Sequence, residues 1–218
     1  KITILGCGSS FGVPLFHNIW GKCDPKEPKN KRTRPSILVQ KNNKNLLIDT
    51  SPDLKQQFLS NKIDNIDTVF YTHEHADHTH GINELRSINL IHGKIIPCYG
   101  NEQTMDKITN SFNYLFENTE KSYYPAILSN NLFSSNEFDI FGINIKLINQ
   151  NHGDIDSIGF IFDNKIAYNL DVKYFYDQKE YFKKIENIDH WVVGCLRIDP
   201  HISHASLDEV KEWLDIVK

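Results

Sequence analysis

Four candidate metal ligands, His73, His75, Asp77 and His78, fall within one stretch of six residues. Neutral imidazole and carboxylate groups suit divalent cations of hard or borderline character, and no cysteine lies in the stretch to compete. Residues two apart, such as His73 and His75, can share one ion from a turn, whereas Asp77 and His78 are better placed to reach a second. The spacing therefore predicts a hydrolytic centre with two metal ions. The alternative is a histidine-rich surface loop, which so dense a group of ligand-type side chains disfavours.

The elements around this stretch are predicted to be strands. Residues 69–71 are β-branched or aromatic and read as a buried strand, and Gly81 lets the chain turn away afterwards. Upstream, residues 36–40 and 45–48 look like a hairpin that ends at Asp49. From a strand end, that carboxylate could orient a metal-bound histidine, or it could be an ordinary turn or cap residue.

Two further candidate ligands follow apparent strands in the second half of the chain. His152 comes shortly after the apparent strand 138–148, and Asp171 ends the apparent strand 165–170. A two-metal centre needs another histidine and a bridging carboxylate, and these two positions would supply both.

Two histidines and an arginine, Arg197, His201 and His204, gather before the last predicted helix. Ser206 and Glu209 fit a capping box that opens this helix. The grouping favours a functional loop over three unrelated surface residues.

A glycine-rich loop, Gly6 to Pro14, follows the first predicted strand. Such loops can bind phosphate, but this spacing is not that of a dinucleotide fold, and Val13-Pro14 prevents an immediate helix. A tight turn that brings backbone close to backbone is an equally good interpretation. The basic run 26–34 has Pro28 within it and prolines on both sides, and it could present Arg32 or Arg34 to a phosphate.

The remaining periodicities complete the predicted order of elements. We expect a helix after residue 53 with Leu54, Phe58 and Leu59 on one face, and further helices over 82–90, 102–116 and 174–185. Strands are expected over 94–99 and 157–162, and a buried strand over 190–195. A last helix is expected to face inward with Leu207, Val210, Trp213, Leu214 and Val217. Residues 117–136 are polar and are expected to form a loop, which could act as a lid.

Composition indicates one globular domain. The chain has 218 residues, is 39% hydrophobic and 24% charged, and has no internal repeat. The net charge of −4 argues against a large nucleic-acid footprint. Neither an apolar run of membrane-spanning length nor a signal peptide is visible, although the first residue is not Met. Four scattered cysteines favour a reducing, cytoplasmic setting.

In chain order, several of these stretches together resemble the metallo-β-lactamase superfamily, in the branch that contains the phosphoribosyl 1,2-cyclic phosphate phosphodiesterases. The stretches are Gly6-x-Gly8-Ser9-Ser10-x-Gly12-Val13-Pro14, His73 to His78, His152-Gly153, Asp171, and Pro200-His201-x-x-His204. The resemblance implies an α/β fold, the αβ/βα sandwich of two packed mixed sheets with helices on the outer faces and metals at one edge.

The resemblance also assigns roles by position. One metal would be held by His73, His75 and His152, a second by Asp77 and His78, with Asp171 bridging the two ions, which would be zinc or manganese. A metal-bridging hydroxide would attack phosphorus, with Asp77 and His204 as catalytic residues and His204 as the general acid. A helix N-terminus would disfavour protonated His204. Substrate contacts would come from Arg197, His201 and Ser9, and Asp49 would support the ligands from behind.

Two departures from the family pattern matter. Related chains continue beyond the last helix into a strand that carries a further histidine ligand, so we expect the domain spanning 1–218 to lack its C-terminal strand or strands. The phosphonate-pathway enzymes also carry a cysteine cluster for a structural zinc, and here only Cys23 remains of it. That zinc is therefore not expected.

The leading hypothesis is a dinuclear-metal-dependent phosphodiesterase acting on a small cyclic or nucleotide-like phosphate. A tRNA 3′-processing endonuclease should carry a basic RNA-gripping arm, and none is evident in the sequence. A β-lactamase would usually carry a signal peptide, and none is visible. A thioester hydrolase and a non-catalytic metal-binding module are further alternatives. The expected partner is a small phosphate ester, with no membrane and no nucleic acid, and a homodimer is left open.

Overall fold

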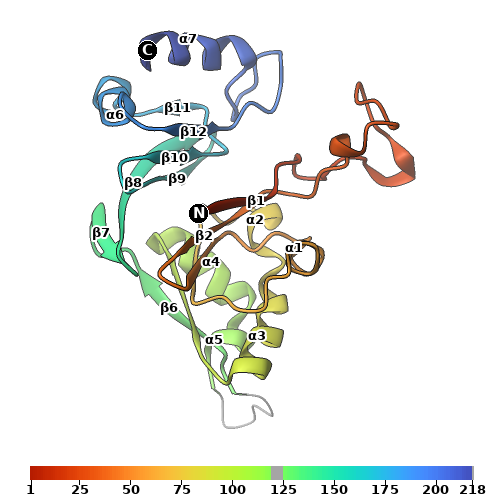
Figure 1. The fold of residues 1–218 in the computed structure, drawn as a ribbon, viewed down its shortest axis with the longest axis vertical. Coiled ribbons are helices and arrows are strands. Elements are labelled where there is room, and N and C mark those ends of the chain that lie inside the picture. The colour runs from red at the N-terminus through yellow and green to blue at the C-terminus, as the bar shows by residue number, and fades with distance from the viewer. Residues whose placement is uncertain (119–124, 218) are drawn as a thin grey trace. The chain divides into compact units, whose positions relative to one another are not determined.

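The computed structural model of the protein describes residues 1–118 and 125–217. Its chain divides into two units, 1–133 and 134–218. Within the described residues, each unit contains one six-stranded sheet of mixed direction, accompanied by helices (Figure 1). The α/β class predicted from the sequence is therefore confirmed.

The sheet of the first unit brings several strand ends to one edge. Its order follows the chain: β1 (Ile2–Gly6), β2 (Ser36–Lys41), β3 (Lys44–Ile48), β4 (Thr68–Phe70), β5 (Ile96–Gly100) and β6 (Leu128–Leu132). The first three strands pair antiparallel and the last four pair parallel. Because β1, β3, β4 and β5 consequently run in one direction, the loops that follow them meet at the same edge.

Helices supply the other half of the apolar core of this unit. They are α1 (Leu54–Asn61), α2 (Ala76–Thr79), the 3-10 turn η3 (Ile82–Glu84), α3 (Leu85–His92), α4 (Glu102–Ser111) and α5 (Asn113–Phe116). Leu54 of α1, Leu85 of α3 and Met105 of α4 are fully buried in one cluster with strand residues such as Leu47 and Val69. The helices are thus held by their apolar faces against the sheet.

Two helix predictions for this unit were wrong in detail. In α1 the buried face is Leu54, Gln57 and Phe58, whereas Leu59 is 72% exposed. Positions three and four residues apart share a helix face, and Leu59 lies further round. The predicted helix 102–116 is interrupted at Phe112, which has non-helical φ −127° and ψ 35°.

The predicted loop 117–136 contains a strand. Residues 128–132 form β6, which pairs in parallel with β5, so this part of the segment is not a lid. Residues 119–124 of the same predicted loop lie outside the described residues. The predicted helix 82–90 is present as η3 followed by α3.

A long excursion joins β1 to β2, and Figure 1 shows it extending from the sheet. We call residues 7–35 the arm. It contains two short 3-10 turns, η1 (Phe16–Asn18) and η2 (Pro28–Asn30). Its two sides are joined by a pair of backbone hydrogen bonds between Val13 and Arg32, each 2.9 Å long.

The sheet of the second unit has the order β11-β8-β9-β10-β12, with β7 also paired to β8. Its strands are β7 (Glu137–Ile140), β8 (Ile143–His152), β9 (Ile155–Phe162), β10 (Ile166–Asn169), β11 (Tyr174–Phe175) and β12 (His190–Val193). The helices α6 (Gln178–Ile185) and α7 (Leu207–Val217) pack on it through buried residues such as Phe182 and Trp213.

Here too the element types were predicted better than their limits. The predicted strand 138–148 is two strands, because Phe141 and Gly142 both have positive φ and form a turn. The predicted helix 174–185 begins only after Asp177, whose side chain caps it. The strand over 190–195 is half-buried, because β12 lies at the end of the sheet order. In α7, Leu214 is 46% exposed.

Across the described residues, no helix combines the length and the apolar character needed to span a lipid bilayer.

Candidate metal centre

The candidate ligands of the first unit begin directly after β4. His73 is fully buried, and its Nε2 lies 3.0 Å from Nδ1 of His75. Two nitrogens that each bind a tetrahedral zinc ion at about 2.0–2.1 Å lie roughly 3.3 Å apart. The spacing of these two imidazole nitrogens therefore fits a shared ion.

Asp77 and His78 follow His75 in the sequence and lie on α2. His78 is buried, and its Nε2 lies 3.6 Å from Oδ2 of Asp77. A nitrogen and a carboxylate oxygen at this separation form a donor pair suited to a borderline divalent cation. Their donor chemistry fits the second ion predicted from the sequence.

Asp49 connects these ligands from the end of β3. Its carboxylate is fully buried, with Oδ2 accepting from His78 Nδ1 at 2.7 Å and from the Thr72 hydroxyl at 2.8 Å. Oδ1 accepts from the Thr72 backbone N–H at 2.8 Å. Burial raises the pKa of Asp49, and the contacts with His78 and Thr72 oppose this rise.

These hydrogen bonds fix the tautomers of two histidines. Because the Thr72 hydroxyl donates to Asp49, its oxygen is left to accept from His73 Nδ1, 2.9 Å away. His78 likewise directs its Nδ1 proton to Asp49. Both rings therefore keep the Nε2 lone pair for a metal ion, the usual arrangement of a metal-binding imidazole.

His152, the last residue of β8, is held in the same way within the second unit. Its Nδ1 lies 2.8 Å from the backbone carbonyl oxygen of Ser203. A carbonyl can only accept, so the proton is on Nδ1 and the lone pair is on Nε2. Neither Ser203 nor Thr72 was predicted from the sequence to support a ligand.

Asp171 and His204 lie together in the second unit. Asp171 follows β10 with φ 48°, and its Oδ1 is 3.6 Å from His204 Nδ1. Burial lowers the pKa of His204 to about 4; Asp171 opposes this, while His152, His201 and Arg197 add to it. A lowered pKa was expected from the sequence, but its leading cause is burial rather than a helix N-terminus.

The surroundings of the three predicted substrate contacts do not indicate a particular role. Arg197 is exposed, and Nδ1 of the half-buried His201 lies 3.3 Å from the backbone N–H of Ser203. The Ser9 hydroxyl donates to the backbone oxygen of Gly12 at 3.3 Å, within its own loop. Their substrate roles stay predictions.

The glycine-rich loop is a site of close backbone approach. A Cβ atom at Gly8 would lie 2.9 Å from two backbone oxygens of the opposite side of the arm, and Gly12 has φ 72°. Only glycine meets both demands without strain. The tight-turn interpretation accounts for these glycines.

Comparison with known proteins places the chain in a family. Residues 44–218 match the model of the beta-lactamase superfamily domain, and the chain belongs to this family. Fold and family together define the class of metallo-β-lactamase superfamily proteins, as the sequence resemblance predicted.

Particular relatives and structures refine this class. An octanoyltransferase from Porphyromonas gingivalis is 30% identical over 174 residues, which are 79% of this chain and 35% of that relative. Ribonuclease Z from Picrophilus torridus is 26% identical over 200 residues, which are 83% of this chain and 60% of the relative. The chain thus spans about a third of the length of the octanoyltransferase and three fifths of the length of the ribonuclease Z. A crystal structure of a new diphosphatase from the PhnP family has 29% identity and a TM-score of 0.84, covering 99% of this chain and 82% of that one.

Proposed function

We propose that this protein is a dinuclear-metal-dependent hydrolase and that it cleaves phosphodiesters in small cyclic or nucleotide-like phosphates. The observation that carries metal-dependent hydrolysis is the Asp49 network, which leaves Nε2 of His73 and His78 available to metal ions. Phosphoryl chemistry is supported by the similarity to the PhnP-family diphosphatase over almost the whole chain.

We propose the ligand sets that the sequence predicted. His73, His75 and His152 would hold one ion, Asp77 and His78 a second, and Asp171 both. When bound, two zinc or manganese ions supply Lewis acidity toward water and toward the phosphoryl oxygens.

The protein's own groups orient this centre and handle protons. Thr72, Asp49 and Ser203 hold the imidazoles of His73, His78 and His152 in their metal-binding tautomers. His204 has a pKa of about 4 and is a neutral imidazole at pH 7, so its N–H would donate a hydrogen bond to the leaving oxygen. Arg197 would attract the anionic substrate.

We further propose a cytoplasmic setting and a small phosphate ester as the partner, with a homodimer still open. The setting is supported by the four cysteines, all of which are free thiols. These properties follow from the sequence predictions.

The test is metal content measured together with turnover of bis(p-nitrophenyl) phosphate, a thioester and a β-lactam. We expect two metal equivalents, turnover of the diester, and loss of both in His78→Ala. His92→Ala is the matched control, since this histidine is exposed and, within the described residues, its ring hydrogen-bonds to the backbone oxygen of Asp64. Full metal loading with turnover of the thioester alone would overturn the phosphodiesterase proposal, and a protein that binds metal without any turnover would be a binding module.

A ribonuclease is the second candidate function. It is favoured by the similarity to ribonuclease Z and by residues 22–34 of the arm, a basic stretch that was not interpreted as an RNA-gripping arm from the sequence. A precursor tRNA in the same assay decides between the two, because cleavage of that RNA with poor turnover of small diesters would favour the ribonuclease.

A further inference from the structure

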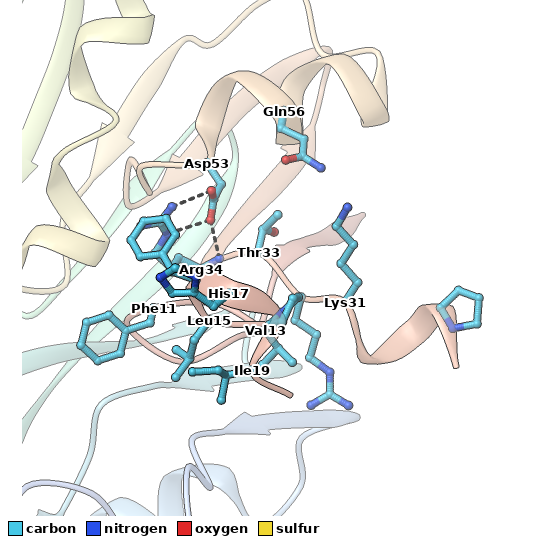
Figure 2. A pocket seen from close by; sticks show the side chains of 15 residues that line it. Phe11, Val13, Leu15, His17, Ile19, Lys31, Thr33, Arg34, Asp53 and Gln56 are labelled. Carbon is cyan, nitrogen blue, oxygen red and sulfur yellow. Dashed lines mark hydrogen bonds and ion pairs between the residues drawn. The ribbon is translucent and has the colours of Figure 1, made fainter. Parts of the chain in front are cut away.

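An open pocket of about 780 Å³ lies within the first unit, between the arm and the start of α1 (Figure 2). Its volume is in the range of pockets that bind small molecules. No residue of this pocket was predicted to be a metal ligand. The pocket is therefore a feature separate from the candidate metal centre.

One side of the pocket is apolar and carries exposed aromatic rings. It is formed by Phe11, Val13, Leu15, Phe16 and Ile19, of which Phe11 is 76% and Phe16 is 93% exposed. In Figure 2, Phe11, Val13, Leu15 and Ile19 follow one side, and Lys31 lies on another. Exposed aromatic rings beside a cavity offer flat faces on which a planar ring can stack.

The opposite part of the lining is cationic. Lys31 and Arg32 are exposed, and within the described part of the chain neither forms an ion pair with a carboxylate. Arg34, by contrast, is held by Asp53 through contacts of 2.7 and 2.8 Å. Residues 22–34 contain six lysines and arginines and two carboxylates, although the whole chain has a net charge of −4. The charge of the pocket therefore favours an anionic ligand.

The pocket also adjoins the edge that carries the metal ligands of the first unit. The arm starts at the end of β1, at the same sheet edge as the ends of β3 and β4. Arg34 lines the pocket, and the pKa of its guanidinium is raised chiefly by the hydrogen bond to Asp53, with a smaller contribution from the charge of Asp77. A substrate with its scissile phosphate at this edge could extend one ester arm into the pocket.

We infer that the pocket binds the nucleoside portion of a nucleotide substrate. The base stacks against Phe11 and Phe16, and Lys31 and Arg32 contact a second phosphate rather than the scissile one. This inference rests on the proposed function and names its substrate class: nucleotide esters that carry a further phosphate.

A series of three p-nitrophenyl phosphodiesters tests this directly. The ester arm opposite the nitrophenolate is methyl, thymidine, or thymidine 3′-phosphate, so the leaving group is constant. We expect kcat/KM to rise about tenfold when thymidine replaces methyl, in line with the stacking of one base, and up to about fivefold when the second phosphate is added, in line with a solvent-exposed charge contact. Phe16→Ala should abolish the first rise, and the double change of Lys31 and Arg32 to Ala should abolish the second.

Matched controls lie on the same unit away from the pocket. Leu90→Ala removes another side chain that is 85% exposed, and Lys107→Ala removes another exposed cation. Both variants should keep the two rises. Equal kcat/KM for the three esters, or a Phe16→Ala variant that keeps the first rise, would overturn the inference.

Binding separates this inference from the proposed function. Calorimetric titration with thymidine 3′,5′-bisphosphate needs no turnover, and Phe16→Ala should weaken its binding about tenfold. If no ester is hydrolysed yet this binding and its loss are observed, the pocket assignment stands and the phosphodiesterase fails. If Phe16→Ala instead converts a dimer to a monomer in sedimentation and leaves nucleotide binding intact, the apolar side is a contact between copies and the inference is wrong.

Discussion

Replacing Asp49 by Asn should weaken metal binding while leaving the shape of the side chain nearly unchanged. The carboxylate accepts three hydrogen bonds, one from the Thr72 backbone at Oδ1 and two, from the Thr72 hydroxyl and His78, at Oδ2. An amide has one oxygen and one NH₂ group, so it cannot accept all three.

Each orientation of the new amide has a calculable cost. If its oxygen keeps the Thr72 N–H, the NH₂ group faces His78 Nδ1, and the His78 proton must move to Nε2, where it blocks metal binding. Loss of such support typically weakens metal affinity 10–100-fold, which is about 1.4–2.7 kcal/mol. If the amide is turned over, the buried Thr72 N–H loses its acceptor at a cost of about 1–3 kcal/mol in folding free energy.

The assay combines zinc competition against a chromophoric chelator with urea unfolding in EDTA. Asp67→Asn is the control, because this carboxylate also accepts from a backbone N–H and from lysines but precedes β4, at the strand end opposite His73. We expect the control to keep its zinc affinity. An Asp49→Asn protein with unchanged zinc affinity and unchanged unfolding free energy would refute the proposed role of the network.

Three further predictions concern stability. Ser206→Ala removes a buried cap of α7 and should lower the unfolding free energy in urea by about 1 kcal/mol, and an unchanged midpoint would contradict the capping interpretation. The pKa of Asp53 is lowered chiefly by its hydrogen bond from Arg34. The ionised carboxylate therefore stabilises the folded protein fully above its ordinary pKa of 3.8, and this stabilisation is lost as the pH falls through the lower pKa of the folded state. In Asp53→Asn, the decrease in unfolding free energy between pH 6 and pH 2 should therefore be smaller by up to about 1 kcal/mol, as measured from unfolding curves across this pH range. Gly153 has φ 75°, and in Gly153→Ala the new Cβ would lie 2.8 Å from the Cβ of Ser203. This substitution should destabilise the fold by about 1–3 kcal/mol, and an unchanged melting temperature would disprove this.

The fold could be predicted where burial dominates the pattern. The apolar residues of β3 and β4 and the Ser206 cap of α7 belong to the elements that the sequence indicated. By contrast, β6 reads Leu-Ser-Asn-Asn-Leu, which has low strand propensity, and it forms because its backbone completes a ladder with β5. Such pairing depends on a neighbour that lies distant in the sequence, so local patterns miss it.

The candidate site likewise contains residues that the sequence indicated and residues that only the structure shows. The spacing of His73, His75 and His78 singled them out as candidate ligands, because several ligand-type residues close together are rare. Thr72 and Ser203 escaped notice, since they act through a hydroxyl and a backbone carbonyl that any loop could supply. Their roles arise from which atoms the fold brings together, and no spacing rule encodes that.

The left-handed backbone at Asp49 and Asp171 limits how this centre can change over time. Both follow a strand at φ values of 62° and 48°, a conformation that aspartate, asparagine and glycine tolerate better than most residues. An aspartate codon becomes an asparagine or a glycine codon by a single base change. The easiest mutations at these two positions therefore discard a carboxylate without straining the chain. Variants with a weakened candidate metal centre therefore lie one base change away, while glutamate, which would keep the charge, is disfavoured by the left-handed backbone.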